Sequence, residues 1–192
     1  MERKRLTRQE SRLVTQAILI DAAEEVFLRE GFEHASVEQI TEAAGFSRGA
    51  FYSNFSDKDD LALAVIDKRR RHAVAALKIF QRIGDPAGQK AAIRDWFAEQ
   101  CRQRNWIALR AEFSRRAERS PLLEGRLAEL CRLEIQTIAQ SVPANGSSQA
   151  AVALALMAAC HGLGSIGFRG APDLDRLREE AAHLVFDRVA QG

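Results

Sequence analysis

Apolar residues recur at three- and four-residue spacing along most of the chain, which is the period of one buried face of an α-helix. The first such stretch begins near residue 12 and carries Val14, Ile18, Ala22 and Val26 on one stripe. No segment alternates apolar and polar residues over a useful length, as a half-buried strand does. The pattern therefore predicts an all-α protein of about nine helices.

The densest series of helix signals in the chain surrounds Gly45. Ser36 and Gln39 fit a capping box, in which a hydroxyl accepts a hydrogen bond from a free amide and the glutamine reaches back. Gly45 stands where a helix ends in a left-handed residue, and Ser47 caps a second, short helix at once. Two helices joined by a glycine turn are typical of a helix-turn-helix, so we expect a DNA-reading motif over about residues 35–54.

The second helix of this motif has the side chains that a recognition helix needs. Gly49 and Ala50 keep its tip slim, and Arg48 has the fork that reads O6 and N7 of guanine or clamps a phosphate. Tyr52 follows one turn later and is long enough to reach the DNA backbone. An ordinary three-helix cluster with similar caps is the alternative. The residues expected to contact DNA are Arg5, Arg8, Ser36, Val37, Ser47, Arg48, Gly49, Ala50, Tyr52, Ser53, Asn54 and Lys58.

From Ile18 to about Leu63 the chain resembles the N-terminal domain of TetR-family transcriptional regulators. One departure is Asn54, where the family often has histidine; asparagine can still donate to a phosphate or pair with adenine. The resemblance implies a DNA-binding domain over about residues 12–72 and a helical effector-binding and dimerisation domain over 73–192. The matching positions are Ala22, Phe27, Gly31, Phe32, Ser36, Val37, Ile40, Ala43, Gly45, Ser47, Gly49, Tyr52, Phe55, Lys58 and Leu61.

The net charge is only +2, so bulk charge does not indicate nucleic acid. The chain nevertheless opens on a basic arm, which either follows DNA or is a solvated tail. A second basic run, residues 68–72, lies in mid-helix and favours a solvated collar, because consecutive residues point all round a helix. The basic residues of the arm are Arg3, Lys4, Arg5, Arg8 and Arg12.

A long helix is predicted from Asp57 to about Ile83, too long for a small N-terminal domain alone. A helix shared by two domains is a natural lever, because a shift at one end moves the other. In the second domain the aromatic residues are usually core, but the family resemblance also places an effector pocket there. The residues expected to line that pocket are Trp96, Trp106, Phe113, Met157, Cys160 and His161.

The expected effector is apolar or aromatic. Asp95, Glu99 and Glu112 flank the aromatic residues at helical spacing, so a cationic effector is expected if one of these acids turns inward. The alternative is that all three face solvent. For His161, a histidine satisfied within the core is the alternative to a ligand contact.

The segment 150–160 is apolar on all sides, which indicates burial from more than one direction. In the last helix, four apolar residues repeat at three-four-three spacing. We expect these two helices to form a homodimer interface, and the resemblance implies a four-helix bundle with the symmetry mate. The interface residues expected are Ala155, Ala159, Leu174, Leu177, Ala181 and Leu184.

The sequence favours neither an enzyme nor a metal or cofactor site. It has no workable Ser-His-Asp set, no phosphate-binding glycine loop, and no histidine at metal-ligand spacing from a cysteine or second histidine. Its three cysteines, odd in number and far apart, fit a reducing cytoplasm, with a redox sensor as the alternative. The charged start lacks the apolar core of a secretory signal, and the longest apolar run is shorter than the ~20 residues of a membrane span. We expect a cytoplasmic protein.

These features predict a ligand-responsive transcriptional regulator, a repressor in preference to an activator. It is expected to bind a near-palindromic operator as a homodimer and to be released by a small effector. The alternative is a DNA-binding chromosome-organisation factor of the same fold without an effector. A crevice walled by Trp96, Trp106 or Phe113 would favour the regulator, and a solidly packed second domain would favour the alternative.

Overall fold

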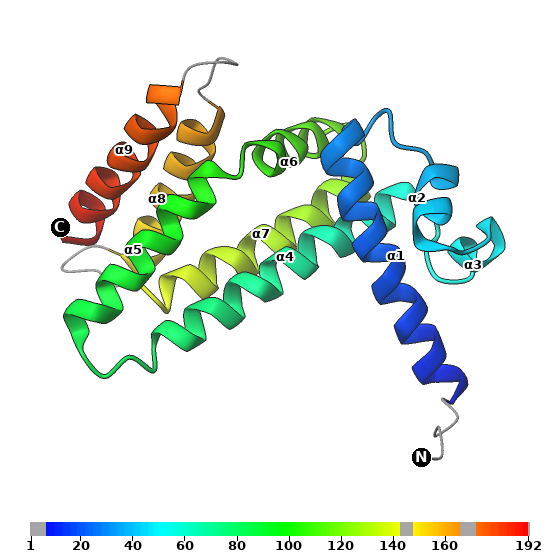
Figure 1. The fold of residues 1–192 in the computed structure, drawn as a ribbon, viewed down its shortest axis with the longest axis horizontal. Coiled ribbons are helices and arrows are strands. Elements are labelled where there is room, and N and C mark those ends of the chain that lie inside the picture. The colour runs from blue at the N-terminus through cyan, green and yellow to red at the C-terminus, as the bar shows by residue number, and fades with distance from the viewer. Residues whose placement is uncertain (1–6, 143–147, 166–171, 192) are drawn as a thin grey trace.

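The computed structural model describes residues 7–142, 148–165 and 172–191, and for residues 172–175, 190 and 191 it describes the backbone only. This part of the chain forms nine helices and no strand, which confirms the predicted all-α class (Figure 1). The helices are α1 (Arg8–Glu30), α2 (Val37–Ala44), α3 (Arg48–Tyr52), α4 (Lys58–Phe80), α5 (Pro86–Arg102), α6 (Arg104–Ala117), α7 (Pro121–Ala139), α8 (Gln149–Ser165) and α9 (Pro172–Gln191).

The helices are gathered at two ends of an elongated molecule (Figure 1). At one end lie α1, α2 and α3, which with the start of α4 are called the head below. At the other end lie α5, α8 and α9, and the long helices α4 and α7 run side by side between the two. α4 therefore belongs to both ends, as its length predicts.

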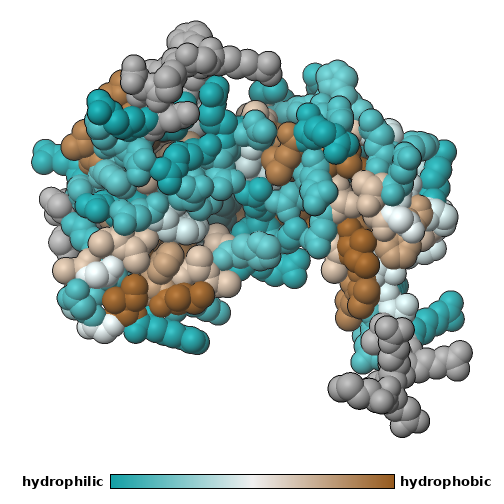
Figure 2. Space-filling view, in the orientation of Figure 1, coloured by the Kyte–Doolittle hydropathy of each residue, from teal (hydrophilic) through white to brown (hydrophobic). Residues whose placement is uncertain are grey.

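Side-chain caps set the helix starts in the head. Ser36 Oγ accepts from the amide of Gln39, whose own side chain accepts from the amide of Ser36, so the predicted capping box is present. α1 begins at Arg8 rather than near residue 12, because Thr7 and Glu10 form a second capping box there. The start of α1 projects away from the other helices, as Figures 1 and 2 show, so the hydrophobic stripe expected along it is buried only in its second half. Val14 and Ile18 are exposed.

The core of the head extends into the second half of the chain. Phe27, Phe32 and Phe51 are almost fully buried in it, and Phe113 of α6 packs edge-on against Phe32 with ring centroids 5.2 Å apart. Leu127 of α7 belongs to the same cluster. The head is thus packed against α6 and α7 through a continuous apolar core.

Polar contacts fasten the head to α6 as well. The Glu112 carboxylate accepts from the amides of Phe32, at 3.0 Å, and Glu33, at 2.8 Å, in the loop between α1 and α2. Arg116, one turn further along α6, donates to both carboxylate oxygens of Asp59 at 2.6 and 2.9 Å. These contacts hold α6 to the loop before α2 and to the start of α4.

A second core lies between α5, α8 and α9, where Phe97 and Phe186 pack with ring centroids 6.0 Å apart. α8 also approaches α6 closely at Gly164. A Cβ at this glycine would stand 1.9 Å from Cδ1 of Ile107, so the approach requires glycine. Within the described ranges, none of the helices has the length and hydrophobicity needed to cross a membrane.

Candidate functional site

The turn between α2 and α3 has the geometry of a helix-turn-helix. Gly45 ends α2 with φ of 70°, a left-handed conformation that glycine adopts without a clash. Ser47 then caps α3, its hydroxyl accepting from the amide of Ala50 at 3.3 Å. Phe51 is fully buried beneath α3, so Arg48 and Tyr52 stand exposed on the opposite face. A short, fixed helix with an exposed polar face is what a reader of the major groove requires.

Arg48 forms an ion pair across the turn with Glu38 of α2, with 2.7 Å between Nη1 and Oε1. The neighbouring Tyr52 hydroxyl and the Glu38 carboxylate raise the pKa of Arg48, so it is fully charged at neutral pH. Both side chains of the pair are well exposed, at 60% and 58%, and exposed pairs of this kind contribute little to stability. Breaking the Arg48–Glu38 ion pair to form a contact with DNA would therefore cost little free energy.

Two side chains expected to contact DNA are turned back onto their own helix. Ser53 Oγ donates to the carbonyl of Gly49 at 2.8 Å, and Asn54 Nδ2 donates to the carbonyl of Ala50 at 2.7 Å. Asn54 is half-buried. The sequence suggested that Asn54 could pair with adenine. In this geometry its amide group instead donates to the end of α3 and is not presented to a base.

Lys58 also differs from the expected phosphate contact. Its ammonium group donates to the carbonyls of Phe32 and Ala35, each at 2.8 Å, and to that of Glu33 at 3.3 Å. It lies 4.5 Å from the centre of the Phe32 ring, and burial lowers its pKa. Lys58 therefore ties the loop between α1 and α2 to the start of α4, and the described geometry does not favour a contact with DNA.

The other predicted DNA contacts remain predictions. Ser47, Gly49 and Arg8 are exposed, whereas Ser36, Val37 and Ala50 are half-buried. Arg5 lies outside the described residues.

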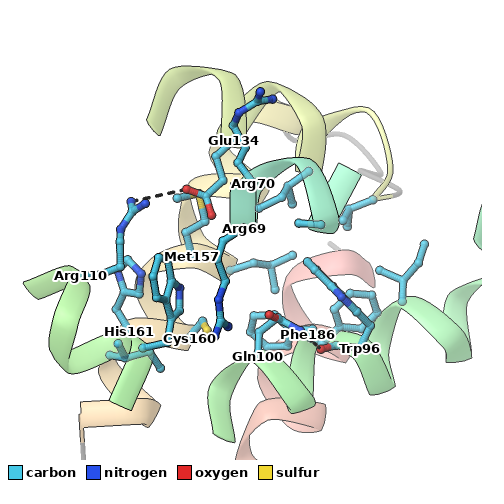
Figure 3. A pocket seen from close by; sticks show the side chains of 18 of the residues that line it. Arg69, Arg70, Trp96, Gln100, Arg110, Glu134, Met157, Cys160, His161 and Phe186 are labelled. Carbon is cyan, nitrogen blue, oxygen red and sulfur yellow. Dashed lines mark hydrogen bonds and ion pairs between the residues drawn. The ribbon is translucent and has the colours of Figure 1, made fainter. Parts of the chain in front are cut away.

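A cavity lies between α4, α5, α6, α7 and α8 (Figure 3). Five of the six residues predicted to line a pocket do line it: Trp96, Trp106, Met157, Cys160 and His161. Phe113 does not, because it is buried in the core of the head against Phe32. The cavity measures about 90 Å³. Typical ligand pockets measure ~300–1,000 Å³, so a ligand of that class must move the surrounding side chains or helices apart.

The polar lining of the cavity differs from the expectation. Asp95, Glu99 and Glu112 do not line it: the first two pair with neighbouring arginines, and Glu112 caps the loop of the head. The charged residues that do line it are Arg69, Arg70, Arg110 and Glu134. The sequence analysis had assigned residues 68–72 to a solvated collar, which is wrong for Arg69 and Arg70, because their side chains are about four-fifths buried.

The head matches one family of known proteins. Residues 19–65 match the family model described as bacterial regulatory proteins, tetR family. The HTH-type transcriptional repressor Rv1474c of Mycobacterium tuberculosis is 34% identical over 105 residues, which cover 54% of this chain and 51% of that protein. The N-terminal part of the chain is therefore a TetR-type domain.

Solved structures extend the likeness over most of the chain. A transcriptional regulator from Rhodococcus sp. Rha1 is 27% identical with a TM-score of 0.70, over 92% of this chain and 96% of that one. FadR from Bacillus subtilis, solved in complex with stearoyl-CoA, has the same fold at 15% identity, with a TM-score of 0.69 over 88% of this chain and 97% of that one. The chain spans about half the length of curated relatives such as Rv1474c, which are transcriptional regulators.

The cavity is joined to the head through Arg69. Its guanidinium lies over the Trp106 ring, 4.6 Å from the centre, and Nη1 donates to Gln103 Oε1 at 3.1 Å. Nε donates to the carboxylate of Glu24 on α1, which also pairs with Lys68. Burial acts to raise the pKa of Glu24, but the hydrogen bonds from Lys68 and Arg69 outweigh it and lower the pKa below its usual value.

The opposite wall holds Arg110, with a side chain only 8% exposed. Its Nη2 lies 3.5 Å from Glu134 and 3.3 Å from the sulfur of Cys131. His161 lines the cavity beside Arg110 (Figure 3) and also reaches solvent. Burial of its imidazole, with the charge of Arg110, lowers its pKa, so His161 is neutral at neutral pH.

Cys160 faces the cavity from α8, close to Cys101 of α5. Contact with the Cys101 thiol and burial raise the pKa of Cys160. The same contact lowers the pKa of Cys101, so the two neighbouring thiols differ in acidity and the redox-sensor alternative stays open.

The helices predicted to form the dimer interface expose apolar side chains. On α9, Leu177 and Leu184 are 50% and 72% exposed. On α8, Ala155 is exposed and Ala159 is half-buried, as is Ala181 on α9. Leu174 lies where only the backbone is described. The interface remains a prediction.

Proposed function

We propose that this chain is a ligand-responsive transcriptional repressor that binds a near-palindromic DNA operator as a homodimer. The observation that carries the proposal is the exposed face of α3, where Arg48 and Tyr52 stand on a turn fixed by Gly45 and Ser47. The similarity to a named transcriptional repressor over half of the chain supports the direction of regulation. Such a repressor works in the cytoplasm, where its operator lies.

The decisive experiment measures DNA binding by the full chain. Duplexes selected from a random-sequence pool provide the operator, and fluorescence anisotropy gives its affinity beside that of unrelated DNA. Arg48→Ala should weaken operator binding by roughly 10- to 100-fold, because a base or backbone contact is lost. Tyr52→Phe should also lower operator affinity, but by a smaller factor.

Glu38→Gln is the matched control, since it removes the ion-pair partner of Arg48 and leaves α3 in place. Its operator affinity should equal or exceed that of the parent. Unchanged affinity and discrimination in both Arg48→Ala and Tyr52→Phe would show that α3 is not the reading helix.

The homodimer is supported by the exposed apolar residues of α8 and α9. Leu177→Asp should yield monomers in sedimentation velocity and abolish tight operator binding, because two half-sites ~34–36 Å apart need two linked heads. Leu122→Asp on α7 is the control, since Leu122 is equally apolar and also exposed but lies away from α8 and α9. A dimer that persists in Leu177→Asp places the interface elsewhere.

Response to an effector is supported by the cavity, which Trp96 and Trp106 help to wall. This crevice is the feature that favours a ligand-responsive regulator over a chromosome-organisation factor without effector. Entry of a ligand larger than the cavity moves α4, and α4 carries the head at its other end. The coupling expected for such a switch is ~1–3 kcal/mol.

A further inference from the structure

The arginines around the cavity differ in how well their charge is balanced. Among the described residues, the charged side chains that line it are Arg69, Arg70, Arg110 and Glu134. Arg70 is paired with Asp67 at 2.7 Å and Arg69 with Glu24, whereas Arg110 lies 3.5 Å from Glu134. The charge of Arg110 is therefore the least well balanced of the three, and it favours the approach of an anionic group.

Arg110 is the buried charge with the weakest partners. A charge-assisted hydrogen bond from a guanidinium measures ~2.7–2.9 Å, and the 3.5 Å between Arg110 and Glu134 is well beyond that range. Its other described acceptor is the Cys131 sulfur, and sulfur accepts hydrogen bonds only weakly. A desolvated guanidinium in this state is stabilised when a second anion comes within reach.

Arg69 faces the same space from α4, and Figure 3 shows it reaching down into the cavity between Cys160 and Gln100. Its contacts in the described residues use Nε and Nη1, and a guanidinium has more N–H donors than these. Arg69 stacks over Trp106, and Arg110 follows Trp106 by one turn on the same face of α6. Trp106 therefore contacts Arg69 and stands one helical turn from Arg110.

A second, more open groove of about 410 Å³ shares Arg69 and Trp106 with the cavity. Arg69 and Trp106 therefore stand between the cavity and a basic groove. The residues that line this groove are Leu28, Arg69, Arg102, Gln103, Arg104, Asn105 and Trp106.

We propose that the effector is an amphipathic anion, with an apolar body among Trp96, Met157 and Phe186 and a carboxylate or phosphate group beside Trp106. This inference rests on the effector site of the proposed function and names its ligand class. The acidic group binds Arg69 and Arg110, and for Arg69 it competes with Glu24. Because Glu24 belongs to α1, this competition loosens the contact between α1 and α4 when the ligand binds.

The test compares probes that share an apolar chain and differ in head group: decanoate, decyl phosphate, decylamine and decanol. Binding to the full chain is measured by calorimetry and tryptophan fluorescence, without DNA. The acids should bind at least roughly tenfold more tightly than the alcohol and the amine, because they gain charge-assisted hydrogen bonds. The tighter of the two acids identifies the carboxylate or the phosphate as the preferred group. An alcohol or amine that binds as tightly as the acids overturns the proposal.

Variants locate the acidic group. Arg69→Gln and Arg110→Gln should each remove most of the preference for acid over alcohol. Arg115→Gln, an exposed arginine on the same helix as Arg110, is the matched control and should keep the preference. If Arg110→Gln fails to fold, Arg110→Lys serves in its place. It retains the positive charge and should keep the preference for acid over alcohol. An acid preference that survives Arg69→Gln and Arg110→Gln unchanged overturns the assignment.

Glu24→Gln tests the competition separately. It should bind decanoate several-fold more tightly than the parent, because the ligand no longer displaces a carboxylate from Arg69. Equal affinity in the two proteins overturns the competition. Binding of the selected duplex is measured in parallel. Release from DNA by decanol or decylamine and not by decanoate would overturn this inference and leave the proposed function standing.

Discussion

The two cores of this molecule are filled to different degrees. Around Phe27, Phe32 and Phe113, in the core shared by the head and α6, the remaining space is about 10 Å³. Between α5, α6, α7 and α8 it is about 90 Å³. One helix, α4, contributes to both cores, with Leu61 in the first and Leu77 in the second. The close-packed end resists deformation, and the hollow end has room to change shape.

Polar groups follow the same division. Where the head meets α6, Lys58 donates to three carbonyls and Glu112 accepts from two amides, so these half-buried groups are well satisfied. The exception in the head is Oδ1 of Asn54, which is buried without a hydrogen-bond partner among the described residues. At the cavity, Arg110 has only long or weak partners. The difference suits a protein in which one end must keep its shape and the other must respond.

Phe32→Ala, in the head, should cause the largest loss of stability. Its ring is fully buried and contacts the rings of Phe27 and Phe113, so the loss in free energy of unfolding should be about 3–5 kcal/mol. Met157→Ala at the cavity wall should cost less, about 2 kcal/mol, because that side chain is smaller and only half-buried. Urea denaturation measures both values. Equal losses would show that the two cores are equally rigid.

Glu112→Gln should weaken the link between the two ends. A neutral amide oxygen replaces a carboxylate that accepts from the amides of Phe32 and Glu33, and the expected loss is about 1–3 kcal/mol. Operator affinity should fall together with stability, since the loop precedes α2. Glu118→Gln, at an exposed position after the end of α6, should change neither quantity. Loss of stability in both variants alike would rule out the proposed role of the loop contact.

Filling the cavity should cost little and block the ligand. Ala73 lines the cavity from α4, and Ala73→Leu should change the free energy of unfolding by no more than about 1 kcal/mol, because the added atoms enter open space. Binding of the tightest head-group probe should fall by roughly tenfold or more. Ala75→Leu, exposed on the same helix, is the control for helix propensity. A large destabilisation by Ala73→Leu would mean that the hollow end is as rigid as the head.

The smallest effect expected is a pH dependence at the junction. The pKa of Glu24 is lowered in the folded protein, so the unfolded chain binds more protons in acid and stability rises with pH. The contribution is complete above the unfolded pKa of ~4.3 and is lost as pH falls through the lower folded value. Denaturation between pH 3 and pH 6 should show a shallower slope for Glu24→Gln than for the parent. Identical slopes would leave Glu24 without a role in acid sensitivity.

Local chemistry made the head predictable. Ser36, Gly45, Ser47 and Asp57 act on neighbouring amides and carbonyls, so the starts of α2, α3 and α4 follow from a few adjacent residues. The five correct cavity residues came from family resemblance and from aromatic content, both visible in the sequence.

The rest depends on contacts between distant segments. Glu112 meets amides about 80 residues away, and Phe113 enters the head because α6 packs there. Arg69 and Arg70 lie in a run of basic residues that the sequence suggests is solvated. Their burial becomes visible only when α4 packs against α1, α5 and α7. The inward turn of Lys58 likewise depends on carbonyls of the preceding loop.

The double attachment of α6 limits how freely the proposed regulator could change its ligand over evolution. Arg110 borders the cavity, and Glu112, two positions along the same helix, caps the loop of the head. A substitution that repositions α6 for a larger ligand also moves Glu112 and Arg116, and with them the contacts before α2 and α4. Variants that evolve a new effector specificity should therefore often repress poorly or stay bound to the operator when the effector is present. Compensating changes in the loop between α1 and α2 would be needed to restore a working switch.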